Sequence, residues 1–265
     1  MNVAIFCADF SLVSIFIEQY FNELAKNSIF IKIIVHDQNT SKKRNFLAHS
    51  IKIASRQAKV ARCTILSAFL RRAIWRMFID KVHHEKMESR NLFNIDLKPV
   101  SSLNTEEAIG VTKENHCDFI CLMGTRVLSK RILEELGIPV INIHSSDPKV
   151  IRGGPSVFWE IYNNSQEISL TIHKVTEVLD AGTILLQQNI PIIYKSLLAE
   201  TIKSTLLQSQ GVIAKMFRDV LISYKSGTLR EMEYAPGQLF VTPSIGQMVK
   251  AQFICMKNYR HTNSS

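Results

Sequence analysis

Two strands and an intervening helix are predicted by residues 2–35, which read NVAIFCADFSLVSIFIEQYFNELAKNSIFIKIIV. Residues 2–7 and 29–35 are short apolar runs, and residues 10–24 between them carry apolar side chains at helical spacing. A strand, a helix and a strand in close succession form a βαβ unit, which favours a parallel sheet with right-handed crossovers. We therefore expect an α/β protein, and we interpret its start as a strand rather than a signal peptide.

Later segments continue this alternation of strands and helices. Residues 118–124 form a continuous apolar run, which is typical of a central parallel strand buried on both faces. Further strands are predicted at 140–144, 169–175 and 183–188, and helices at 129–136, at 196–224 and after Thr242-Pro243-Ser244. A short hairpin is expected around Pro236-Gly237. The C-terminal part is thus expected to be a short helical and β extension.

The composition narrows the class of protein. Of 265 residues, 46% are apolar and 21% are charged, which excludes a disordered or collagen-like chain. No run of about eighteen apolar residues occurs, so we expect no membrane-spanning helix. The five cysteines form no CxxC pair, and we interpret Cys117 and Cys121 as buried thiols. We therefore expect a reducing, cytoplasmic location and no metal site.

The net charge of +9 is concentrated in one segment. Residues 42–90 hold thirteen Lys or Arg against three acids, so the rest of the chain is close to neutral. We interpret residues 42–98 as a basic insert of two helices between strands, because apolar residues recur there at helical spacing. Residues 60–82 are amphipathic, so one interpretation is peripheral binding to an anionic membrane. The other interpretation leaves the arginines in solvent and packs the apolar side chains on the domain. Those side chains are Ile65, Phe69, Trp75 and Phe78.

Four short motifs carry the candidate chemistry. They are Asn142-x-His144, Arg152-Gly153-Gly154, Thr171-x-His173 and Asp180-x-Gly182. Asn142 and His144 are two residues apart on a predicted strand and project to the same side, where an amide and an imidazole stabilise a developing oxyanion. Asp180 keeps that imidazole protonated or relays a proton to and from it. Because a substrate amine can supply the nucleophile, the set indicates acyl transfer to an amine.

The order of these motifs resembles that of the formyltransferases that use 10-formyl-tetrahydrofolate. The likeness is strong over residues 115–190 and rests on Asn142-Ile143-His144-Ser145, Ile151-Arg152-Gly153-Gly154-Pro155, Leu170-Thr171-Ile172-His173 and Leu179-Asp180-Ala181-Gly182. It implies a Rossmann-like, mostly parallel sheet and transfer of a formyl group to a primary amine. It also implies catalytic roles for Asn142, His144 and Asp180. The family usually has Pro directly after the histidine, whereas this chain has Ser145 there. We expect this difference to change the shape of the loop and not the catalytic chemistry.

The resemblance also implies two sets of binding residues. The folate pterin is expected along the segment after the central strand, with the loop around Asp180 on its other side. The implied folate-binding residues are Met123, Gly124, Thr125, Arg126, Val127, Leu128, Leu179 and Gly182. The implied acceptor-binding residues are Ser146, Arg152, Gly153, Gly154, Thr171 and His173. A purely structural role for His173 stays open, and a turn alone also explains Arg152-Gly153-Gly154.

We divide the chain into a catalytic domain, residues 1–192, and a C-terminal extension, residues 193–265. The basic insert interrupts the first part, and the extension suits contacts in a homodimer.

The acceptor amine is less well defined by the sequence. Glycinamide ribonucleotide is disfavoured because residues 7–11, after the first strand, contain no glycine to wrap a phosphate. Methionyl-tRNA formyltransferases add a C-terminal β-barrel, which the residues after 224 do not predict, although the basic insert suits an RNA backbone. We favour a nucleotide-linked aminosugar, because a basic insert suits an anionic diphosphate. An amino-acid-derived amine such as a hydroxyornithine stays open.

Overall fold

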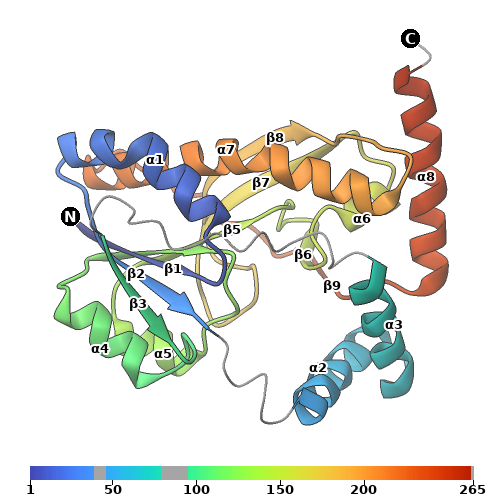
Figure 1. The fold of residues 1–265 in the computed structure, drawn as a ribbon, viewed down its shortest axis with the longest axis horizontal. Coiled ribbons are helices and arrows are strands. Elements are labelled where there is room, and N and C mark those ends of the chain that lie inside the picture. The colour runs from blue at the N-terminus through green and yellow to red at the C-terminus, as the bar shows by residue number, and fades with distance from the viewer. Residues whose placement is uncertain (39–45, 79–94, 264–265) are drawn as a thin grey trace.

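A seven-stranded sheet forms the centre of the molecule (Figure 1). The structure is a computed structural model that describes residues 1–38, 46–78 and 95–263. The strand order is β3-β2-β1-β4-β5-β7-β8. The strands are β1 Asn2–Cys7, β2 Phe30–Asp37, β3 Asp96–Val100, β4 Phe119–Met123, β5 Val140–His144, β7 Glu167–Lys174 and β8 Ile184–Pro191. Neighbours from β3 to β5 are parallel, and β7 is antiparallel to both β5 and β8. The expected α/β fold with a mostly parallel sheet is confirmed.

Helices cover both faces of the sheet because the central strands are apolar on both sides. Alternate residues of β1 enter different cores: Val3 and Ile5 pack with α1 and α7, and Ala4 and Phe6 pack with α4 and α5. The helices are α1 Ser11–Lys26, α7 Leu198–Lys225, α4 Glu106–Glu114 and α5 Lys130–Leu136. Figure 1 shows α1 and α7 side by side on one face and the other two on the opposite face. Because α7 shares the core of α1, residue 192 does not mark a break in the packing.

The basic insert contains the two expected helices, α2 (Phe46–Ala61) and α3 (Ile65–Phe78). They pack on each other through small side chains, and the Trp75 ring joins them to the main body by an edge-on contact with Phe158, at 5.4 Å between ring centroids. Trp75 is buried and Phe69 is half-buried, as the packing interpretation expects, whereas Ile65 is exposed. The side chain of Phe78 and residues 79–94 lie outside the described residues.

The insert is shorter than residues 42–98. Strand β3 begins at Asp96 and belongs to the central sheet, so the last residues assigned to the insert are part of the core fold. None of the helices in the described part of the chain is long and apolar enough to cross a membrane.

The C-terminal part contains no hairpin at Pro236-Gly237 among its described residues, so that prediction is wrong. Instead, β9 (Gln238–Phe240) pairs in parallel with β6 (Ile151–Gly153) in a small second sheet. The Gly237 N–H donates to the Pro148 carbonyl at 2.9 Å, and a Cβ on Gly237 would lie 2.5 Å from the Lys149 carbonyl oxygen. This glycine is therefore explained by the close approach of two backbones rather than by a tight turn. Two further helices are α6 Phe158–Tyr162 and α8 Ile245–Asn263, the latter at the expected place.

Candidate active site

The register between β5 and β7 gathers four of the predicted site residues. Asn142 lies directly opposite His173, and His144 lies opposite Thr171. Residues two apart on a strand share a face, and so do residues directly opposite each other in an antiparallel pair. All four side chains therefore belong to the same face of the sheet, at the carboxyl end of β5.

Asp180 reaches this face from the connection between β7 and β8. Its φ of +46° lies in the left-handed region, which Asp adopts more readily than most residues other than glycine. The Gly153 N–H donates to its carboxylate Oδ2 at 3.0 Å, and the Tyr234 hydroxyl donates to its main-chain carbonyl at 3.1 Å. Tyr234 lies outside the four motifs, and no pattern in the sequence points to it.

Arg152 and Gly182 shape the same connection. Arg152 donates from Nε to the Gly237 carbonyl at 2.8 Å and from a terminal nitrogen to the Leu179 carbonyl at 3.2 Å. A Cβ on Gly182 would lie 1.8 Å from the Lys174 carbonyl oxygen, so only glycine fits this close approach. Arg152 thus links the Asp180 loop to the C-terminal segment.

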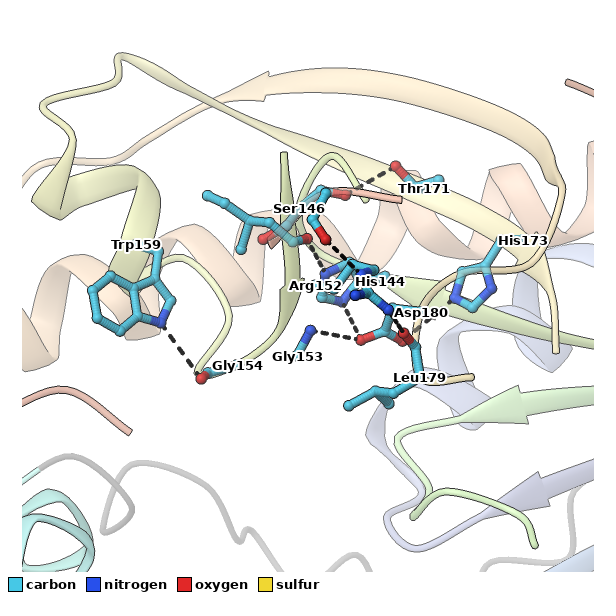
Figure 2. A network of polar contacts seen from close by, with 12 residues as sticks. His144, Ser146, Arg152, Gly153, Gly154, Trp159, Thr171, His173, Leu179 and Asp180 are labelled. Atoms are coloured by element: carbon cyan, nitrogen blue, oxygen red, sulfur yellow. Dashed lines mark hydrogen bonds and ion pairs between the residues drawn. The ribbon is translucent and has the colours of Figure 1, made fainter. Parts of the chain in front are cut away.

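Asp180 lies between two imidazoles, as Figure 2 shows. Its Oδ2 is 3.5 Å from Nδ1 of His144, and its Oδ1 is 3.6 Å from Nε2 of His173. The other nitrogen of each ring faces a main-chain carbonyl: Nε2 of His144 faces Ile151 at 3.0 Å, and Nδ1 of His173 faces Lys174 at 2.8 Å. Since a carbonyl only accepts, those two nitrogens carry the hydrogen in the neutral rings. The two nitrogens that face Asp180 are then free to take up a proton.

Burial and the charges of neighbouring groups act in opposite directions on the pKa values of His144 and Asp180. Burial lowers the pKa of His144, and this outweighs the Asp180 carboxylate and the Ile151 carbonyl, which favour the charged ring. Burial alone would raise the pKa of Asp180, but contacts with His173, His144 and the Gly153 N–H outweigh it and leave that pKa below its usual range. The site therefore combines an ionised carboxylate with a neutral His144 at neutral pH.

A second buried cluster supports the loop after β5. The Ser146 hydroxyl donates to Oε1 of Glu160, and the Thr171 hydroxyl donates to the Ser146 carbonyl at 3.0 Å. Burial raises the pKa of Glu160 to about 7. Glu160 was also missed, because a single acid in a short apolar helix carries no motif. Ser146 and Thr171, predicted to bind the acceptor, are almost fully buried and instead brace this loop.

A cleft of about 280 Å³ opens beside Asp180. Its lining includes five of the residues expected to bind folate, namely Thr125, Arg126, Val127, Leu128 and Leu179. It also includes Asn142, Gly153, Gly154, His173 and Asp180. Three other residues expected to bind folate, Met123, Gly124 and Gly182, do not line it. His144 does not line it either, because its ring is buried behind Asp180.

An ion pair holds one wall of the cleft. Nε and one terminal nitrogen of Arg126 donate to the two carboxylate oxygens of Asp37, both at 3.1 Å. Asp37 is buried at the end of β2, so the pair ties the segment after β4 to a strand that lies on the other side of β1 in the sheet.

Comparison with known families agrees with this geometry. A family model described as "Formyl transferase" matches residues 13–214. The chain belongs to the formyl transferase family. The match confirms the resemblance expected from the four motifs.

Two curated relatives are methionyl-tRNA formyltransferases that match part of the chain. A methionyl-tRNA formyltransferase of Finegoldia magna is 25% identical over 126 residues, which is 47% of this chain and 41% of that protein. A second one, from Clostridium acetobutylicum, is 32% identical over 96 residues, 36% of this chain and 31% of that protein. The chain thus spans less than half the length of the curated relatives it matches.

Solved structures are similar over more of the chain. A sugar N-formyltransferase from a Shewanella species superposes with a TM-score of 0.58 at 14% identity and covers 96% of this chain and 87% of that one. A phosphoribosylglycinamide formyltransferase from Bacillus halodurans gives 0.55 at 16% identity, with 85% and 96% covered. At these identities the likeness concerns the fold.

The cleft fits a folate ring system. Its wall combines six apolar side chains with polar ones, as in sites for flat, mainly apolar rings with a polar edge. The apolar ones are Leu122, Val127, Leu128, Val175, Val178 and Leu179. The polar ones are Thr125, Arg126, Asn142, His173, Thr176 and Asp180.

Proposed function

We propose that this protein transfers a formyl group from 10-formyl-tetrahydrofolate to a primary amine. One observation carries the proposal: an ionised carboxylate, Asp180, lies within 3.6 Å of two imidazoles and lines the same cleft as the Asn142 amide. An amide donor stabilises a developing oxyanion, and a carboxylate and imidazole cluster accepts a proton, which are the two requirements of acyl transfer to an amine. When bound, 10-formyl-tetrahydrofolate supplies the formyl carbon and takes a proton on the nitrogen that loses it.

Asn142 is the side chain that we assign to the oxyanion. It lines the cleft, and the removal of one such donor costs about 10²–10³ in rate. The sequence suggested that a protonated His144 would be a second donor. In the geometry described above, both of its ring nitrogens already face other groups, Ile151 and Asp180. We therefore assign it a positioning role that acts through the carboxylate.

Asp180 is the group that we assign to proton transfer. It lines the cleft, its negative charge favours protonation of Nδ1 of His144, and Nε2 of His173 lies 3.6 Å from its other carboxylate oxygen. The proton that the attacking amine loses would be held by this cluster, which is placed to give it up again within the cleft. One proton enters and one leaves, so the cluster is unchanged after each turnover.

An anionic small molecule is the acceptor that we favour, and a nucleotide-linked aminosugar is the first candidate. The fold likeness to a sugar N-formyltransferase over nearly the whole chain supports this choice. Methionyl-tRNA is the second candidate, because the curated relatives quoted above are methionyl-tRNA formyltransferases.

The test is incubation with 10-formyl-tetrahydrofolate and a panel of amines. The panel contains nucleotide-linked aminosugars, charged initiator tRNA and hydroxyornithine, and the readout is release of tetrahydrofolate above the rate without amine. Asp180→Asn should lower turnover at least 10³-fold, and Asp96→Asn, an exposed carboxylate on the far edge of the sheet, serves as the matched control. Equal rates for wild type and Asp180→Asn would remove the basis of the assignment.

A pH profile tests the positioning role of His144. The His144 ring becomes charged as the pH falls, and the charged ring lowers the pKa of Asp180. His144→Asn should therefore move the acid limb of kcat/KM to higher pH. A residue with only a packing role would lower the rate without moving that limb.

A further inference from the structure

A second cavity adjoins the active-site cleft, with a volume of about 440 Å³. The two share three lining residues, Gly153, Gly154 and Leu179, so they are separated by little more than the backbone of the Arg-Gly-Gly loop. The remaining walls come from α2, α3, Pro155, and β9 with the two residues that follow it. The basic insert thus contributes directly to a space beside Asp180.

Three arginines line this second cavity. Arg72 and Arg76 are four residues apart and share one face of α3, and Arg56 extends from α2. Among the described residues of the lining there is no Asp or Glu. Three guanidinium groups on one concave surface attract an anion, and arginine matches phosphate oxygens with paired N–H donors.

The helices that carry the arginines are attached to the body at two points. The Gln57 amide donates to the Thr242 hydroxyl at 3.0 Å, which ties α2 to the segment after β9. Trp75 is buried against Phe158 and also lines the cavity. Together with Val60 and Leu239, it gives the cavity apolar walls beside its positive charge. Such a combination suits an organic phosphate ester better than a free inorganic ion.

We propose that this second cavity binds a phosphate or diphosphate ester of the acceptor, with the acceptor amine directed past Gly153 and Gly154 toward Asp180. The inference rests on the proposed function for the identity of the amine, but not for the binding of the anion. We commit to a small molecule because the cavity has the volume of a small-ligand site, whereas an RNA backbone is bound along an extended basic surface. The three arginines then select the acceptor rather than take part in the chemistry.

Direct binding tests this without any turnover. Inorganic pyrophosphate and uridine diphosphate are titrated into the folded protein by calorimetry at low and moderate salt. Arg56→Gln, Arg72→Gln and Arg76→Gln should each weaken binding of both probes about ten- to a hundredfold. Lys59→Gln is the matched control, because Lys59 is an exposed cation on α2 that does not line the cavity.

Three results would overturn the proposal. The first is that wild type binds neither probe, and the second is that the arginine variants bind them as tightly as Lys59→Gln. The third is that charged initiator tRNA binds and loses affinity in the arginine variants while pyrophosphate neither binds nor competes, which would assign the arginines to a nucleic acid.

A kinetic arm separates this proposal from the proposed function. With an active nucleotide-linked aminosugar, the arginine variants should raise KM with little change in kcat, since they remove ground-state binding. With the free aminosugar, which lacks the diphosphate, the same variants should show a smaller rise in KM. Pyrophosphate binding without formyl transfer to any amine would refute the proposed function and leave the anion site in place. Formyl transfer with a KM that the arginine variants do not change would support the proposed function and refute the anion site.

Discussion

Replacement of Glu160 by Gln tests whether a buried charge destabilises the loop that carries the active site. Glu160 is 7% exposed, its Oε1 accepts a hydrogen bond from Ser146, and its Oε2 has no hydrogen-bond partner among the described residues. Burial raises its pKa from 4.5 to about 7. When folding raises the pKa of a carboxyl group, the group contributes its full stability at pH values below its pKa in the unfolded chain. For Glu160 this contribution is lost as the pH rises through about 7.

The size of the effect follows from that difference in pKa. At 1.36 kcal/mol per pH unit, the change from 4.5 to about 7 corresponds to about 3 kcal/mol of lost stability at high pH. Between pH 5 and pH 8.5 the loss grows by about 2–3 kcal/mol. Gln has no charge to bury and retains an oxygen for Ser146. Contributions that do not depend on pH, such as a new unpaired amide hydrogen, cancel when the two pH values are compared.

Urea unfolding at pH 5 and pH 8.5 measures this directly. Glu160→Gln should gain about 2–3 kcal/mol relative to wild type when the pH is raised, and Glu107→Gln, an exposed acid on α4, should gain almost nothing. If the free energy of unfolding differs between Glu160→Gln and wild type by the same amount at both pH values, the charge of the buried carboxyl does not destabilise the fold.

Three further changes probe the parts around the cleft. Gly182→Ala places a Cβ where the Lys174 carbonyl lies at 1.8 Å, so the loop must move, and we expect a loss of about 3 kcal/mol by urea unfolding together with loss of turnover. Arg126→Met removes the guanidinium that faces the buried Asp37 carboxylate, and a fall in Tm equivalent to about 2 kcal/mol is expected, reduced from the buried-pair value because Arg126 is partly exposed. His144→Gln should flatten the loss of stability between about pH 7 and pH 5, because a histidine with a lowered pKa takes up its proton preferentially in the unfolded chain. An unchanged acid slope would contradict burial of His144 as a neutral ring.

The sequence predicted the sheet well because its signals are local. Apolar runs and helical spacing identify strands and helices whatever their partners, and the alternation in β1 places neighbouring residues in different cores. The hairpin at Pro236-Gly237 failed for the opposite reason. A Pro-Gly pair also occurs where two backbones come close, and only the position of Lys149 shows which explanation holds.

The candidate site was predicted in its members but not in its arrangement. The motifs identified Asn142, His144 and Asp180, yet they carried no sign that His144 lies behind the carboxylate while His173 lines the cleft. That difference comes from the left-handed backbone at Asp180 and the hydrogen bond from Tyr234, which is 54 residues away in sequence. Such long-range contacts leave no periodic pattern in the chain.

The pairing of β6 with β9 bears on any attempt to trim or fuse this protein. Three residues near the C-terminal end run alongside the Arg-Gly-Gly segment, and they are hydrogen-bonded to it in register. A version cut after α7 would keep every strand of the large sheet while losing the neighbour that fixes Gly153, whose N–H in turn orients Asp180. Engineers should therefore treat the region beyond α7 as part of the catalytic scaffold and place tags or partner domains past α8.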